Sequence, residues 1–218
     1  MRKIILVLLL LLPTSVLFAQ NSNTQIRFRG GAILGLNATQ VDGDNIVGYH
    51  KLGLNAGFIS EIPINQKWFV SLEILFNQKG SQSSRRQDSL ALGTPSLYPA
   101  DFKIKLNYAD VPILINYQDK KNISFGLGFS VGWLVYDTLR IESYLQGVPP
   151  SSLYTISKLR KTDEDVLVNF DYSITQHFIV NFRFAYSFLA FGQSPYSKQY
   201  HYGMYNNILT CRMIYLFF

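Results

Sequence analysis

Apolar and small polar residues alternate along the stretch 123–135, which reads ISFGLGFSVGWLV. Every odd position carries a bulky apolar side chain, whereas five of the six even positions are Ser or Gly. A period of two is typical of a β-strand, because successive side chains point to opposite faces. The stretch also exceeds the roughly 9–11 residues that a tilted strand needs to cross a bilayer. The pattern therefore predicts a strand whose apolar face points either into a soluble core or outward to lipid.

Similar alternation recurs along the chain and predicts eight strands. Their ranges are 26–38, 52–62, 68–79, 102–117, 123–136, 164–172, 178–190 and 202–218. Four long connections alternate with three short turns, which is the arrangement of an outer-membrane barrel with its short turns on one side. Unpaired backbone amides are costly in lipid, so the first strand must pair with the last. The predicted fold is all-β, an eight-stranded antiparallel up-and-down transmembrane β-barrel.

The range 102–117 breaks the simple alternation. Its apolar residues occupy even positions over 104–108 but odd positions over 111–117. Pro112 falls near the change and cannot donate a hydrogen bond to a neighbouring strand. We therefore expect a β-bulge near Ala109–Pro112.

Volume and charge favour a barrel with its apolar face outward. An eight-stranded lumen is just wide enough to be filled by side chains, and the bulky faces of these strands would overfill it. We expect five aromatic residues to face lipid: Phe125, Phe129, Trp133, Phe182 and Phe184. The opposite faces carry charges of both signs: Arg27, Arg29, Glu61, Glu73, Lys103, Lys105, Asp171 and Arg183. We expect these charges to form a polar network that plugs the lumen, the alternative being a narrow conducting path.

Residues 1–19 have a basic start, an apolar core and a small-residue cleavage site, which together predict a secretory signal peptide. The mature barrel domain is then 20–218, and we expect it in the cell outer membrane. A secreted soluble barrel that binds a small apolar ligand is the alternative from another class. The formal charge of +6 includes two charges of the signal peptide, and the remainder gives no reason to expect a nucleic-acid partner. The single cysteine, Cys211, cannot form an internal disulfide.

Five segments resemble the PorT-like family of small outer-membrane β-barrels. They are GAILGLN, YHKLGLNAGF, SLEILFNQKGS, YADVPILINY and GLGFSVG, in this order over most of the mature chain. The resemblance implies an eight-stranded barrel in a double-membraned bacterium. Some relatives are tied to a protein secretion and gliding apparatus, and the family supplies no catalytic motif. The partners that follow are outer-membrane lipid and a protein of the envelope or of a secretion machinery.

Few residues suggest chemistry. The three histidines, at positions 50, 177 and 201, have no metal-ligand spacing, and we expect neither a metal nor another cofactor. Ser194, Ser197 and His201 share the last loop and are the only basis for a lipid-modifying enzyme, so we expect no enzyme activity. The long loops also carry two basic patches: Arg85 and Arg86, and Lys158, Arg160 and Lys161. The predicted role is structural or interaction-based, including an accessory role in secretion or envelope assembly, with a narrow pore or lipid-modifying enzyme as alternatives.

Overall fold

The computed structural model describes residues 28–44, 48–82, 101–142, 159–193 and 203–217. Strand-forming alternation produces these elements: β1 (Arg29–Asp42), β2 (Lys51–Pro63), β3 (Trp68–Gln82), β4 (Asp101–Lys120), β5 (Ile123–Glu142), β6 (Thr162–Ser173), β7 (Phe178–Ser187), β8 (Gly192–Gln193) and β9 (Gly203–Leu216). No helix in these ranges has the length and apolarity needed to span a membrane. The predicted signal peptide and Arg27 lie outside the described residues.

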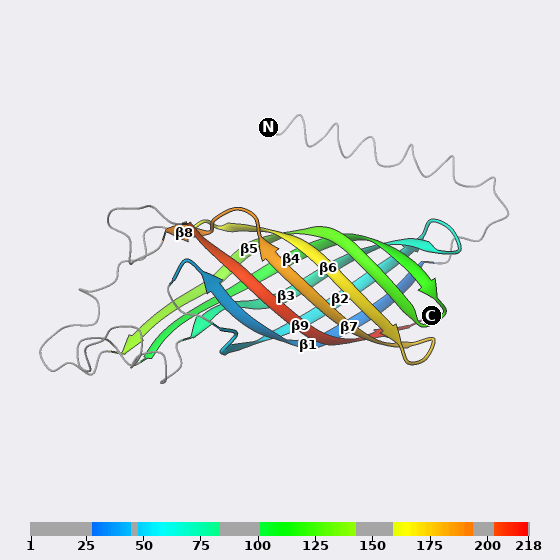
Figure 1. Cartoon of the computed structure of the whole chain (residues 1–218), viewed down its shortest axis with the longest axis horizontal. Coiled ribbons are helices and arrows are strands. Elements are labelled where there is room, and N and C mark those ends of the chain that lie inside the picture. The colour runs from blue at the N-terminus through cyan, green and yellow to red at the C-terminus, as the bar shows by residue number, and fades with distance from the viewer. Residues whose placement is uncertain (1–27, 45–47, 83–100, 143–158, 194–202, 218) are drawn as a thin grey trace, which may run out of the picture.

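Antiparallel neighbours close into a barrel (Figure 1). The order of the sheet is β1-β2-β3-β4-β5-β6-β7-β9, and β1 pairs with β9 from Gly31↔Leu216 to Asp42↔Tyr205. The two-residue β8 pairs only with the start of β9 and is not part of the wall. The prediction of a closed, eight-stranded antiparallel barrel is therefore confirmed. The short β8 was not predicted.

The two ends of the barrel differ. The connections 64–67, 121–122 and 174–177 lie at one end, which we call the turn end, and β9 finishes there as well (Figure 1). The other end, which we call the loop end, receives the four longer connections. This is the alternation of short and long connections that the sequence predicted.

The bulky aromatic residues are exposed on the outer wall of the barrel. The exposed fraction is 63% for Phe129 and 51% for Trp133, and the three other aromatic residues expected to face lipid are also exposed on this wall: Phe125, Phe182 and Phe184. The inner side of β5 is small because side chains of β4 lie across it. A Cβ atom added to Gly126 would lie 2.1 Å from Asn116 Oδ1, and one added to Gly132 would lie 2.2 Å from Asp110 Oδ1.

The bulge prediction near Ala109–Pro112 is wrong. The inward positions of β4 run without a break from 104 to 116, so its early apolar residues point into the barrel. The register shift lies between Asn107 and Tyr108, which pair with Tyr136 and Leu134, and the extra residue is Val135 on β5. The apolar phase changes because the interior along β4 becomes apolar toward the loop end, where Ile104, Leu106 and Tyr108 are buried.

Lys103 and Lys105 are a second correction, because both lie on the outer wall rather than in the lumen. Their strand neighbours Ile104 and Leu106 are fully buried inside, in a cluster with Val41 and other residues. Alternation along β4 then directs the two lysines outward.

Replacing Phe129 with arginine is expected to destabilise the barrel by about 2–4 kcal/mol, the cost of an arginine on a lipid face at mid-depth. Phe129 is at the centre of the apolar alternation of β5 and pairs with Ile113 and Val166. Equilibrium unfolding in liposomes measures the change. The matched control is Tyr136→Arg near the loop end, where the cost is about 0–1 kcal/mol. Equal losses at the two positions would contradict an outward-facing apolar band.

Candidate functional site: the polar interior

Two arginines clamp one glutamate at the centre of the lumen. Glu73 on β3 accepts two hydrogen bonds from Arg183 on β7, at 2.8 and 3.0 Å, and two from Arg212 on β9, both at 2.9 Å. Glu73 is 1% exposed and Arg212 is 1% exposed. β3 and β7 are four strands apart in either direction around the barrel, so the pair joins opposite walls. We call these three residues the ionic clamp.

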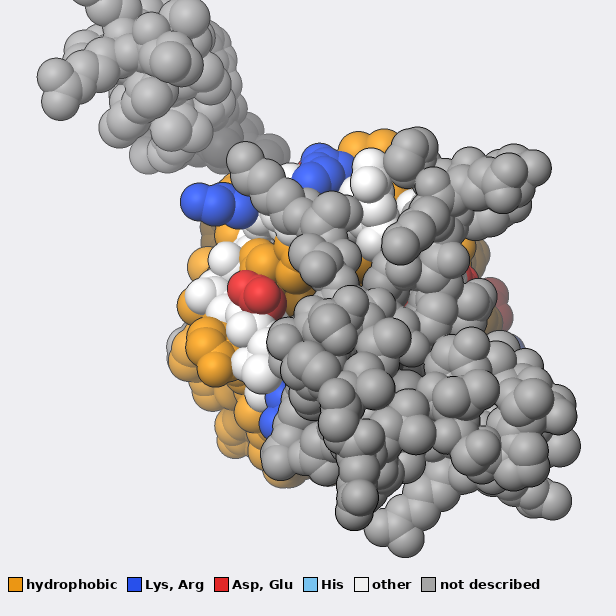
Figure 2. Space-filling view, turned by 90° about the vertical axis from the view of Figure 1, so that its left-hand side faces the viewer, with side chains coloured by type: hydrophobic (Ala, Val, Ile, Leu, Met, Phe, Trp, Pro, Cys, Tyr) orange, Lys and Arg blue, Asp and Glu red, His pale blue; other side chains and the backbone are white. Residues whose placement is uncertain are grey.

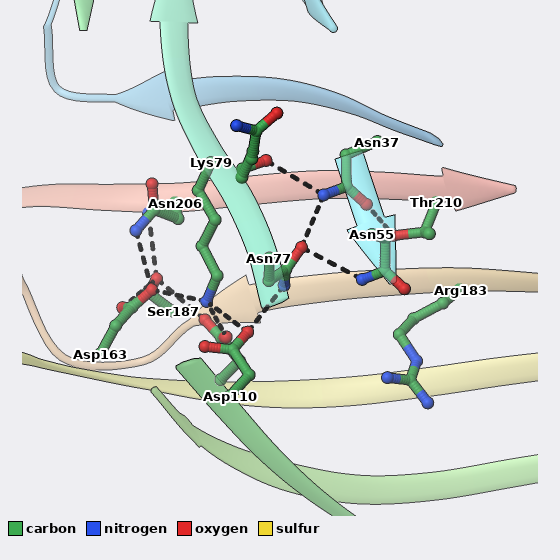
Figure 3. A network of polar contacts seen from close by, with 12 residues as sticks. Asn37, Asn55, Asn77, Lys79, Asp110, Asp163, Arg183, Ser187, Asn206 and Thr210 are labelled. Carbon is green, nitrogen blue, oxygen red and sulfur yellow. Dashed lines mark hydrogen bonds and ion pairs between the residues drawn. The ribbon is translucent and has the colours of Figure 1, made fainter. Parts of the chain in front are cut away.

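Amide side chains continue the network from the clamp toward the loop end (Figure 3). Asn77 Oδ1 accepts hydrogen bonds from Asn37 at 2.6 Å and from Asn55 at 3.1 Å. Thr210 donates to Asn37 Oδ1 at 2.9 Å. Asn77 then donates to Asp110 Oδ2 at 2.6 Å, which links the amides to the next group of charges. Each of these hydrogen bonds supplies a partner to a buried amide, which would be costly to leave unpaired.

A second charged group surrounds Lys79. Its Nζ atom lies 3.2 Å from Asp110, 2.9 Å from Asp163 and 2.6 Å from Asp165. The same atom lies 4.8 Å from the centre of the Tyr108 ring, within range of a cation–π interaction. Two further side chains hydrogen-bond to Asp163 (Figure 3): Ser187 and Asn206. We call Lys79 and its three carboxylates the lysine cluster.

An apolar plug occupies part of the lumen beyond the lysine cluster, toward the loop end, beside buried polar side chains of β1 to β3: Thr39, Lys51 and Ser81. Its buried members are no more than 1% exposed: Val41, Ile104, Leu106, Tyr108, Phe191 and Met204. Leu134 and Leu159 pack against them. Because Tyr108 also faces Lys79, the plug directly adjoins the lysine cluster.

The turn end holds a cavity of about 680 Å³. Arg29 and Glu61 form an ion pair of 2.7 Å there, and the Arg29 side chain is 41% exposed. Asp171 lines the cavity and accepts hydrogen bonds from Asn181 and from Ser124. Along β3 the lining extends from Phe69 only as far as Glu73, so the cavity ends at the ionic clamp. We call this cavity, which does not extend past the ionic clamp, the vestibule.

The structure brings the expected lumen residues together in two groups. Glu73 meets Arg183 in the clamp, and Arg29 meets Glu61 in the vestibule wall. Sequence reasoning missed other members of the network: Arg212, Lys79, Asp110, Asp163 and Asp165. The available signal was parity, because alternation along the predicted strand 202–218 places Leu209, Cys211 and Met213 on one face and Arg212 on the other.

The remaining candidates do not form a site. Arg160 pairs with Glu164 at 2.8 Å, four residues along the chain, and Cys211 is exposed on the outer wall. His177 lies 2.9 Å from the carbonyl of Leu216. The described ranges contain no group of three or more side chains arranged to hold a metal ion. Several expected residues lie outside those ranges: Arg85, Arg86, Lys158, Ser194, Ser197 and His201.

Comparisons with known proteins give one family. The family model described as outer membrane protein beta-barrel domain matches residues 18–191. A comparison with curated protein sequences finds no significant match.

Similar solved structures include three outer-membrane barrels. Ail, the attachment invasion locus protein of Yersinia pestis, has 12% identity and a TM-score of 0.47, and the match covers 88% of this chain and all of Ail. Neisserial surface protein A has 10% identity and a TM-score of 0.47, covering 86% of this chain and 96% of that one. OprG from Pseudomonas aeruginosa has 14% identity and a TM-score of 0.41, covering 87% and 94%.

Proposed function

Because this chain belongs to the outer membrane protein β-barrel domain family, and is an outer-membrane protein, we propose that it is a closed, non-conducting barrel with a structural or interaction role. Its long loops face the outside of the cell and its turn end faces the periplasm. The observation that carries the proposal is the ionic clamp, which spans the lumen from β3 to β7 and β9. The role is non-enzymatic, and an accessory part in secretion or envelope assembly is its most specific form.

The contents of the lumen support closure at three successive levels. The vestibule ends at Glu73, the lysine cluster follows on the same strand, and the apolar plug lies beyond it. A water-filled pore needs a continuous polar lining. In an eight-stranded barrel the side chains that point inward are enough to fill the lumen, so no separate channel is left beside them. The buried apolar plug therefore favours a closed barrel over a conducting pore.

We expect the purified protein to show no discrete conductance steps in a planar lipid bilayer. A large porin reconstituted in the same way serves as the control for insertion. The second part of the test removes one positive charge from the ionic clamp with the variant Arg183→Ala. Steady single-channel steps in the wild-type protein whose size changes with Arg183→Ala would establish the narrow pore instead.

The interaction role is tested with a photo-cross-linking residue placed at two exposed positions. His50 lies at the loop end and Gln66 in the β2–β3 turn, so each position reports on one side of the membrane. A discrete protein cross-link at one position and not at the other supports an interaction role and gives its side. Cross-links to lipid alone at both positions, together with normal secretion and envelope integrity after deletion of the gene, would remove the role.

The order of the five segments quoted above supports placing the chain near PorT-like barrels within this family. If the resemblance holds in function, the cross-linked partner belongs to a secretion apparatus. A partner from lipid or peptidoglycan assembly would separate this chain from that group.

A further inference from the structure

The outer wall of β4 carries two lysines at the loop end. Lys105 is exposed and Lys103 is half-buried, while Ile104 and Leu106 point inward into the apolar plug. Because Ile104 and Leu106 pack inside the barrel, the two lysine side chains are held on its lipid-facing side. Figure 2, which views the loop end, shows Lys and Arg side chains beside apolar ones at the rim.

The height of these lysines can be derived from the strand. Tyr117, near the turn end of β4, packs against Trp68 with ring centroids 4.9 Å apart and fits an interfacial girdle. A strand that rises about 3.3 Å per residue with a tilt of about 40° climbs roughly 30 Å between Tyr117 and Lys105. The outward positions between them run from Ile115 to Asn107 and are apolar up to Ala109. Since the apolar band of such barrels is about 25 Å tall, Lys105 lies just beyond it, in the headgroup layer.

The direct cross-strand partners of the two lysines carry no negative charge, and the nearest acidic positions in the register are Asp137, which pairs with Leu106, and the pair Asp101↔Glu142. In the register, Lys105 lies beside Gly80 and Thr138, and Lys103 lies beside Gln82 and Arg140. Within the described ranges, no carboxylate forms an ion pair with either lysine. Lys51, which is 4% exposed, lies close enough to interact electrostatically with both. Like charges gathered in this way repel one another, and an anion from outside the chain would relieve the repulsion.

We propose that Lys103 and Lys105 bind the phosphate groups of the anionic glycolipid in the outer leaflet. The inference rests on the proposed orientation, in which the loop end faces outward. Both ammonium groups are on flexible stems that can reach a phosphate at the edge of the apolar band. Tyr136, which is 60% exposed and pairs with Asn107, adds an aromatic surface beneath the headgroup. The ligand class is a phosphorylated, acylated disaccharide.

The test compares two double variants in nanodiscs of neutral phosphatidylcholine. Lys103→Gln with Lys105→Gln removes the proposed site. Lys67→Gln with Lys120→Gln removes two exposed lysines at the turn end and is matched in charge. The probe is a bis-phosphorylated, acylated glucosamine disaccharide added at increasing mole fraction, with the dephosphorylated lipid and phosphatidylglycerol as separate arms. Bound lipid is counted by native mass spectrometry, and heat-modifiable migration on a gel verifies that each variant is folded.

We expect the loop-end variant to bind the phosphorylated glycolipid about 25-fold more weakly, because each lysine near a charged membrane surface contributes about fivefold. The turn-end variant should bind it like the wild type. Equal binding of the phosphorylated and dephosphorylated lipids, or wild-type binding by the loop-end variant, would overturn the proposal. Lysine-dependent binding of phosphatidylglycerol, with no binding of the glycolipid, would also overturn the proposal. It would argue that the loop end faces the periplasm instead of the outside of the cell. None of these outcomes changes the conductance result, so failure here is distinct from failure of the closed-barrel function.

Discussion

Replacing Glu73 with alanine is expected to destabilise the barrel by about 3–5 kcal/mol, because Arg183 and Arg212 are left buried without their counter-charge. Both guanidinium groups make two hydrogen bonds to the same carboxylate, so one substitution removes four bonds at once. The free energy of unfolding from urea titrations in liposomes measures the loss. The substitution leaves the lipid-facing residues unchanged, so the loss of stability comes from the interior of the barrel.

Arg160→Ala is the matched control for this prediction. It also breaks an ion pair, but the Arg160 side chain is 42% exposed, and water replaces its interaction with Glu164. Exposed pairs of this kind contribute about 0–1 kcal/mol. A Glu73 variant that unfolds at the same urea concentration as the Arg160 variant would show that the clamp does not hold the walls together.

Replacing Lys79 with methionine should have an effect of similar size, about 3–5 kcal/mol. The change keeps most of the unbranched side chain and removes the ammonium group, which leaves Asp110, Asp163 and Asp165 facing one another without a cation. Their mutual repulsion is strong because all three carboxylates are buried. Unfolding in urea, followed by intrinsic fluorescence, measures the loss.

Raising the salt concentration separates this buried effect from a surface one. The three carboxylates are no more than 2% exposed, so added salt should not restore the stability of the Lys79 variant. Lys67→Met at the turn end is the control, because Lys67 is exposed and its loss should stay within about 0.5 kcal/mol. Recovery of the Lys79 variant in high salt would place its charges in contact with solvent.

The fold could be predicted from the sequence because lipid and a narrow lumen impose opposite demands on alternate residues. Strands such as β5 and β7 have a bulky face and a small or polar one, and no other regular structure fits that pattern. The positions at which the strands end were harder to predict from the sequence. β5 continues to Glu142, past the last predicted residue at 136, because its backbone still pairs with β4 where the membrane pattern has ended.

The interior could be predicted only in part. Glu73 and Arg183 were expected inside from parity, but their contact depends on which strands lie opposite in the closed barrel. Alternation does not supply that information for strands that are not neighbours. The apolar plug was missed for a related reason, since Ile104 and Leu106 have the same side chains as lipid-facing residues. Only their packing against Phe191 from the last connection shows that they face inward.

The pairing of β1 with β9 has a consequence for how the molecule comes into being. These two strands come from opposite ends of the sequence, and the seam also brings Arg212 within reach of a glutamate on β3. The complete ionic clamp therefore forms only when the final strand, which carries Arg212, has joined the sheet. Contacts this distant along the chain make for slow maturation. Until that strand pairs with β1, Glu73 lacks one of its two guanidinium partners.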